Sequence, residues 1–127
     1  MSERALREIY LRGFEIVVKT AKPWVLMTAY NRVNGVRSST NKEAICGILR
    51  SEWGYDGVVV TDWWAFSLIE EEIAAGSDVK MPEMITHMAP NPPAPFDLAD
   101  KLRNGSVDRD LCRDSVRRIL ELMGKLN

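Results

Sequence analysis

The chain has 127 residues, a formal net charge of −1, 46% hydrophobic residues and 28% charged residues, the profile of one globular domain at most. It has no basic excess to meet a phosphate backbone, so no nucleic-acid partner is expected. Its longest apolar runs are far too short to cross a bilayer, and no charged and then apolar leader precedes Ser2, so we expect no membrane span and no signal peptide in this chain, and the compartment stays unknown.

The cysteines and the single histidine do not predict a metal or redox site. Cys46 and Cys112 fall on predicted helices, lie far apart in the sequence and have no CxxC partner, so we expect free, half-buried thiols. His87 lies in a loop rich in methionine and proline and is expected at the surface. A histidine-rich metal site is excluded, and no cofactor is predicted.

The chain begins with an amphipathic helix followed by a strand. Apolar residues between Ser2 and Ala21 recur at steps of three and four, which predicts a helix with one buried face. Lys22-Pro23 ends it, because proline disfavours helical geometry in the preceding residue. Trp24–Tyr30 then has the composition of a buried strand.

A loop and a second helix lead to the second strand. We expect Asn31–Thr40 to be a plain loop, because a helix start rather than a second strand follows Asn34-Gly35. The last residue of that loop has capping-box spacing with Glu43, and the apolar stripe of the helix continues to Gly54. The strand Gly57–Thr61 comes next, and a strand, helix and strand in this order predict parallel neighbours.

The rest of the chain continues the alternation. We expect a helix at Ser67–Ala75 and a short third strand at Ser77–Met81. A proline-rich loop, Met84–Pro95, precedes helices at Phe96–Arg103 and Val107–Leu126, the last one capped by Asp108 or Ser106. Four cations of the last helix are expected on a solvated face: Arg113, Arg117, Arg118 and Lys125. Alternation of this kind is typical of an α/β fold, and about three parallel strands would leave both edges of the sheet open.

The functional signal lies where the second strand ends. A short valine run bounded by Asp56-Gly57 predicts a strand buried on both faces, which places Asp62 at its carboxyl end. Ligands bind at that edge in barrels and open α/β sheets. The alternative is that Asp62 only caps the next turn or helix.

Three linked segments carry a recognisable pattern. They are Met27-Thr28-Ala29-Tyr30-Asn31-Arg32-Val33-Asn34-Gly35, Leu49 to Trp63 with its Val-Thr-Asp-Trp end, and Ala75-Gly76-Ser77-Asp78-Val79-Lys80-Met81-Pro82. In order and spacing they resemble the later half of the catalytic barrel of family-three glycoside hydrolases, in the β-glucosidase branch. The opening and closing helices are also similar to that family, so the likeness covers nearly the whole chain.

The resemblance implies a partial TIM-type (β/α) barrel, with residues 1–127 a single fragment of the family's N-terminal barrel domain. It implies that Asp62 is the nucleophile of a retaining β-glycosidase. It also implies that Trp63 walls the sugar site and that Tyr30 and Met27 contact the sugar. The partner would be a β-glucoside or an oligosaccharide. A carboxylate can attack an anomeric carbon and leave again, and an indole offers a pyranose a flat apolar face.

Other residues in the same segments favour structural roles. Asp56 is expected in a turn, Asp78 as a hydrogen-bonding residue of the scaffold and Trp53 in the core, whereas Trp64 fits either the barrel wall or the rim of the site.

The departures from the family imply that the isolated chain is inactive. The first half of the barrel is absent, with its Lys-His motif and sugar clamps, and no second carboxylate has a motif that marks it as the general acid/base. We therefore expect the open edges to be covered by a second copy or by the missing barrel half. The alternative is a non-catalytic sugar-binding or assembly module derived from the same barrel. A Rossmann-type nucleotide binder is disfavoured, because no GxGxxG follows either strand.

Overall fold

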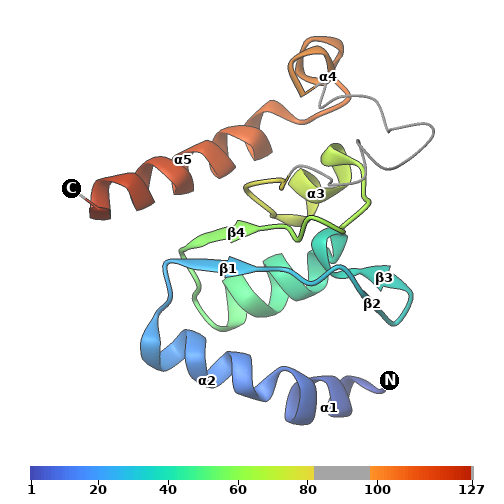
Figure 1. Cartoon of the computed structure of the whole chain (residues 1–127), viewed down its shortest axis with the longest axis vertical. Helices are drawn as coiled ribbons and strands as arrows, with labels where there is room; N and C mark the ends of the chain where they lie inside the picture. Colours follow the sequence, from blue (N-terminus) through green and yellow to red (C-terminus); the bar gives the residue numbers. More distant parts are fainter. Residues whose placement is uncertain (82–97, 127) are drawn as a thin grey trace.

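The computed structural model describes residues 1–81 and 98–126. In the view of Figure 1, helices lie above and below a short pair of strands at the centre. The label η marks a helix of 3-10 or π type. In chain order the elements are α1 (Glu3–Ala5), η1 (Leu6–Tyr10), α2 (Arg12–Ala21), β1 (Val25–Met27), β2 (Arg32–Val33), β3 (Val36–Arg37), η2 (Ser38–Thr40), η3 (Glu43–Glu52), β4 (Val58–Val60), α3 (Ile69–Ala75), α4 (Leu98–Asn104) and α5 (Arg109–Leu126).

The opening helix is confirmed. The elements α1, η1 and α2 follow one another from Glu3 to Ala21, and the Ser2 hydroxyl accepts the N–H of Ala5 at 3.2 Å as a cap. Lys22 ends the helix in the left-handed region, with φ of 47°, directly before Pro23. In the described ranges, no helix is long and apolar enough to cross a membrane.

The central strands are parallel, as predicted. Val25 pairs with Val58 and Met27 with Val60, and the ladder extends to the Thr28 N–H, which donates to the Val60 carbonyl at 2.9 Å. Gly57 permits this approach, since a Cβ there would lie 2.6 Å from the Trp24 carbonyl oxygen. The predicted third strand is reduced to one parallel bridge between Val60 and Val79. The fold is α/β, with few parallel strands and flanking helices, as expected of a partial barrel.

The segment Asn31–Thr40, which we expected to be a plain loop, contains a hairpin, so that prediction was wrong. β2 and β3 pair antiparallel, and Asn34 and Gly35 both have positive φ, 50° and 88°, as a type I′ turn requires. The strands are only two residues long, so the hairpin is complete before the next helix begins. The Asn41 side chain, rather than Thr40, accepts the N–H of Ala44 at 3.1 Å at the start of that helix.

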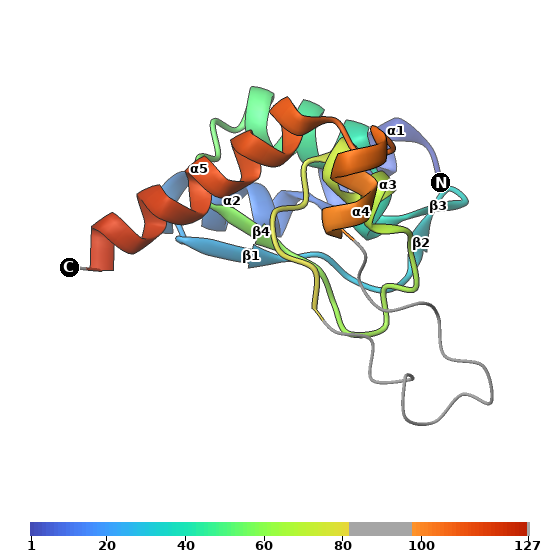
Figure 2. The ribbon, with the colours of Figure 1, turned by 90° about the horizontal axis from the view of Figure 1, so that it is seen from above.

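The first strand is shorter and more exposed than predicted. Only Val25–Met27 of the expected Trp24–Tyr30 is paired as a strand, and Val25 and Met27 are 47% and 45% exposed. Alternate residues of a strand point to opposite faces. The described helices lie to one side of the parallel pair, so Leu26 packs against them while Val25 and Met27 face the uncovered side (Figure 2).

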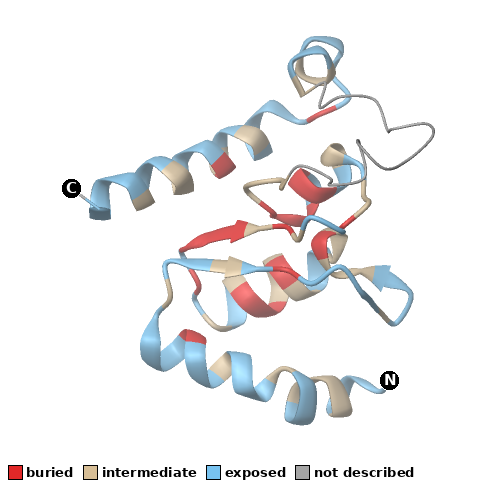
Figure 3. Cartoon of the chain, in the orientation of Figure 1, coloured by how far each residue is buried: buried red, intermediate tan, exposed pale blue. Residues whose placement is uncertain are grey.

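The core lies between β4, η3 and α3, where buried residues gather (Figure 3). Trp53 is half-buried and packs against this cluster, as predicted. The buried members are Val18, Ile45, Leu49, Tyr55, Val59 and Ala75. Burial raises the pKa of the Tyr55 hydroxyl to about 12, and that hydroxyl donates to the Val58 carbonyl at 3.0 Å.

The end of the chain forms two helices. Asp108, one of the two predicted caps, accepts the N–H of Asp110 at 2.8 Å at the start of α5. The loop Met84–Pro95, with His87, and the expected start of the preceding helix at Phe96 lie outside the described residues. Cys46 and Cys112 are free and half-buried, as predicted.

Candidate active site at the carboxyl ends of the strands

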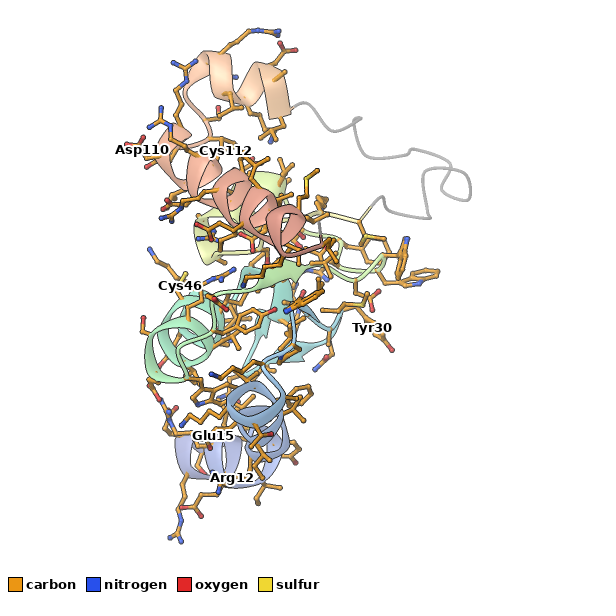
Figure 4. All side chains as sticks on the ribbon, turned by 90° about the vertical axis from the view of Figure 1, so that its left-hand side faces the viewer. Arg12, Glu15, Tyr30, Cys46, Asp110 and Cys112 are labelled. Atoms are coloured by element: carbon orange, nitrogen blue, oxygen red, sulfur yellow. The ribbon has the colours of Figure 1, made fainter. Side chains whose placement is uncertain are left out.

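The parallel pair delivers Asp62 and Tyr30 to one edge of the sheet. β1 and β4 end opposite each other, at Met27 and Val60. Asp62 follows the end of β4 by two residues, and Tyr30 follows the end of β1 by three. Because the strands are parallel and in this register, both loops leave from the same edge. Tyr30 lies on the far side of the molecule from Cys46, which is carried by η3 (Figure 4).

Asp62 forms a tight turn at the end of the strand. Its carboxylate oxygen Oδ1 accepts the Trp64 N–H at 2.9 Å, and its carbonyl accepts the Ala65 N–H at 3.2 Å. Asp62 therefore does cap this turn, as the alternative interpretation of the sequence predicted. The other carboxylate oxygen, Oδ2, takes no part in that turn, and the residue is half-buried.

Aromatic side chains stand exposed around this edge. Tyr30 is 60% exposed, Trp63 36% and Trp64 42%. Trp64 packs edge-on against Phe66, with ring centroids 5.9 Å apart and planes at 80°. Trp64 thus contacts its own loop, and whether it belongs to the barrel wall or to the rim of the site stays a prediction.

A cavity of about 410 Å³ lies on the helix-covered side of β1, among the N-terminal helices, β1 and η3. Leu26 and Thr28 line this cavity, whereas Met27 points to the uncovered face together with Val25. The predicted site residue Met27 and this cavity therefore belong to opposite faces of the sheet.

A buried ion-pair network holds β4 in place. The Asp78 carboxylate is fully buried, and its Oδ2 accepts the Val59 N–H at 2.8 Å. The Nη2 atoms of Arg50 and Arg118 each lie 2.7 Å from one of its oxygens. Burial lowers the pKa of Arg50 from its ordinary value. The scaffold role predicted for Asp78 is confirmed, and the solvated position expected for Arg118 was wrong, because its guanidinium turns inward to this carboxylate.

Sequence reasoning missed a second polar network, behind the loop that follows Asp62. It contains Ser39, Ser67, Glu72 and Lys80, and Glu72 is only 1% exposed. One signal was available. Glu72 follows Ile69 by three residues and precedes Ile73, so it lies on the inward stripe of α3, where a lone carboxylate needs a partner.

Neither network is a metal site. No group of three or more His, Cys, Asp or Glu side chains among residues 1–81 and 98–126 has the arrangement to hold a metal ion.

The sequence matches the description "Glycosyl hydrolase family 3 N terminal domain" over residues 1–122. The match is to that domain, and the chain's place in the later half of the barrel stays a prediction. The chain is 55% identical over 80 residues to beta-glucosidase A of Butyrivibrio fibrisolvens, covering 63% of this chain and 10% of that protein. It is 46% identical over 86 residues to an exo-alpha-(1->6)-L-arabinopyranosidase of Bifidobacterium longum, covering 68% of this chain and 11% of that protein.

A solved structure, beta-glucosidase 3B from Thermotoga neapolitana in complex with glucose, matches with a TM-score of 0.88 and 41% identity. The match covers 96% of this chain and 17% of that one. The chain therefore spans a small part of each relative that it resembles.

Proposed function

This chain belongs to glycosyl hydrolase family 3, and from that premise we propose that it is a segment of a retaining β-glycosidase of the β-glucosidase type, with Asp62 as the nucleophile. In this proposal residues 1–127 form one segment of the later half of the N-terminal barrel domain. The whole enzyme removes terminal β-D-glucosyl residues from β-glucosides or oligosaccharides.

The chemistry assigned to Asp62 is a double displacement. Its ionised carboxylate attacks the anomeric carbon while the leaving oxygen takes a proton from a general acid. A covalent glycosyl-enzyme forms, and water then hydrolyses it while the group that acted as general acid now acts as general base. Asp62 presents Oδ2 for this attack, while Oδ1 is engaged with the Trp64 N–H.

The observation that carries the proposal is the parallel register of Met27 with Val60. It sends Asp62, Trp63, Tyr30 and Met27 to one edge of the sheet, where barrels bind their ligands. Exposed aromatic rings beside a carboxylate suit a sugar, because the apolar face of a pyranose packs on a flat ring.

The name and title of two relatives support glucose as the sugar. One is called a beta-glucosidase, and the Thermotoga neapolitana structure contains glucose. The arabinopyranosidase, a relative of comparable sequence identity, is named for a different sugar. Terminal β-D-glucosyl residues are our first choice of substrate.

The isolated chain is proposed to be inactive. Retaining chemistry needs a second carboxyl group about 5–5.5 Å from the nucleophile, and we assign that group to parts of the enzyme beyond this chain. The uncovered face at Val25 and Met27 fits a barrel that the chain does not complete by itself.

A chimaera tests the proposal. The matching segment of the Thermotoga neapolitana enzyme is replaced by this chain, and hydrolysis of an aryl β-glucoside is measured. We expect turnover, and a loss of at least about a thousandfold in kcat for Asp62→Asn. Asp56→Asn is the matched control, because Asp56 is an exposed aspartate at the opposite end of the same strand. Equal activity of Asp62→Asn and the unsubstituted chimaera would refute the role of Asp62.

A further inference from the structure

The loop that carries Asp62 is strained and is held from behind. We call residues 62–68 the Asp62 loop. Phe66 in its middle has φ of +41°, a conformation that a bulky side chain rarely adopts unless its surroundings impose it. The contacts on either side supply that constraint, because Arg37 donates to the Ala65 carbonyl at 3.0 Å and Ser67 is bound at both its side chain and its backbone.

Ser67 is the centre of these contacts. Its hydroxyl lies 2.6 Å from Glu72 Oε1 and 2.8 Å from the Ser39 hydroxyl. Ser67 donates its one hydroxyl proton to Glu72, so in the contact between the two hydroxyls Ser39 is the donor. Ser39 is fully buried and belongs to η2, which follows the hairpin after β1. The loops that leave β1 and β4 are therefore joined at Ser67.

Lys80 completes the arrangement. Its Nζ donates to the Ser67 carbonyl at 2.7 Å and lies 3.0 Å from Glu72 Oε2. The side chains of Glu72 and Lys80 are 2% and 8% exposed. The ammonium group of Lys80 therefore compensates the buried charge of Glu72 and contacts the backbone of the Asp62 loop at the same time.

A buried ion pair is an energetically costly link between α3 and the segment that follows the bridge at Val79. Apolar residues of similar size often stabilise such a contact as well or better, because the charges lose their hydration. They could not bind Ser67, whose hydroxyl donates to Glu72 and whose carbonyl accepts from Lys80. The charged pair therefore binds the Asp62 loop through Ser67, which apolar side chains would not do.

We propose that Glu72 and Lys80 are positioning residues that act through Ser67 to hold the Asp62 loop in the conformation that presents Asp62 and Trp63 at the strand edge. The catalytic meaning of this role rests on the proposed function of Asp62. The conformational claim does not, so the test measures the loop and not hydrolysis.

Amide hydrogen exchange of the 127-residue chain, followed by NMR, tests the proposal. In Glu72→Gln we expect exchange at Trp64 and Ala65 to accelerate about tenfold, while the ladder amides of Thr28 and Val58 stay within about twofold of the parent. Glu71→Gln is the control, since Glu71 is the exposed neighbour of Glu72 on the same helix. If Glu72 only joined α3 to Lys80, Glu72→Gln would accelerate exchange in α3 and leave exchange at Trp64 and Ala65 unchanged.

A second variant covers general loss of structure. If Glu72→Gln accelerates the ladder amides as much as the loop amides, Ser67→Ala decides. It removes the hydroxyl that contacts Glu72 and Ser39, and it leaves the Glu72–Lys80 ion pair and the bond from Lys80 to the backbone carbonyl of residue 67 in place. Selective acceleration at Trp64 and Ala65 in Ser67→Ala supports the proposal. Unchanged loop exchange in Glu72→Gln, or no selective effect in Ser67→Ala, overturns it.

Discussion

Asp78 and Arg118 are 40 residues apart in the sequence, yet Asp78 Oδ1 and Arg118 Nη2 lie 2.7 Å apart beneath β4. The same carboxylate accepts the Val59 N–H and pairs with Arg50 of η3. One buried side chain thus links the strand that leads to Asp62 with a helix on each side.

Replacing Asp78 by Asn should destabilise the chain severely. The substitution leaves two largely buried guanidinium groups, on Arg50 and Arg118, without their counter-ion, and loss of one partner of a buried ion pair typically costs about 3–5 kcal/mol. Urea unfolding followed by circular dichroism measures the change. Asp114→Asn is the matched control, because Asp114 pairs with Arg117 on the exposed face of α5, the helix that carries Arg118. We expect Asp114→Asn to change the free energy of unfolding by less than about 1 kcal/mol. Equal effects of the two variants would contradict this account of Asp78.

Glu72 should make a contribution to stability that weakens as the pH rises. Burial raises the pKa of Glu72 above its ordinary value of 4.5. Between 4.5 and the folded-state pKa, the folded chain binds more protons than the unfolded chain, so the free energy of unfolding falls with increasing pH. The free energy of unfolding of the parent minus that of Glu72→Gln should therefore decrease from pH 4.5 upward. The difference is measured by urea unfolding at several pH values. A difference that grows with pH would contradict burial as the main influence on this carboxyl group.

The uncovered face of the sheet should cause self-association. An unpaired strand edge beside exposed apolar residues is a template for pairing with another chain. We expect oligomers of the parent chain in sedimentation velocity at micromolar concentration and a shift toward monomer in Val25→Lys. Val36→Lys is the control, since Val36 is 45% exposed, like Val25 at 47%, but lies in the hairpin. A parent chain that sediments as a stable monomer would contradict this expectation.

The isolated chain should not hydrolyse an aryl β-glucoside. It carries the proposed nucleophile without an assigned acid or a complete barrel. Release of the aryl group is followed by absorbance, with the chimaera as the positive control. Turnover by the purified chain that Asp62→Asn abolishes would show that the segment is sufficient for catalysis.

Local pattern predicted the elements that lead to the site. The valine run after Asp56-Gly57 predicted β4, and the order strand, helix, strand predicted its parallel pairing with β1. Helical spacing predicted the opening helix and α5. These features depend on neighbours in the sequence, which is why they could be read from it. The hairpin was missed because its strands are two residues long, too short for alternation to be visible.

The polar contacts behind the site could not be read in the same way. Helical spacing tells which face of α5 is apolar, but it does not say that Arg118 at the border of that face turns inward to Asp78. Ser67 and Ser39, 28 residues apart, carry no pattern that links them. The exposure of Val25 and Met27 could not be predicted either, since it depends on what covers the sheet and not on the composition of the strand.

The most direct test of the central claim is covalent trapping of Asp62 in the chimaera. A 2-deoxy-2-fluoro-β-glucoside with a good leaving group slows the second displacement, so the glycosyl-enzyme accumulates and its peptides can be analysed by mass spectrometry. We predict that the added sugar is found on Asp62 and that Asp62→Asn acquires none. A sugar attached to any other carboxylate, with Asp62 unmodified, would contradict the account.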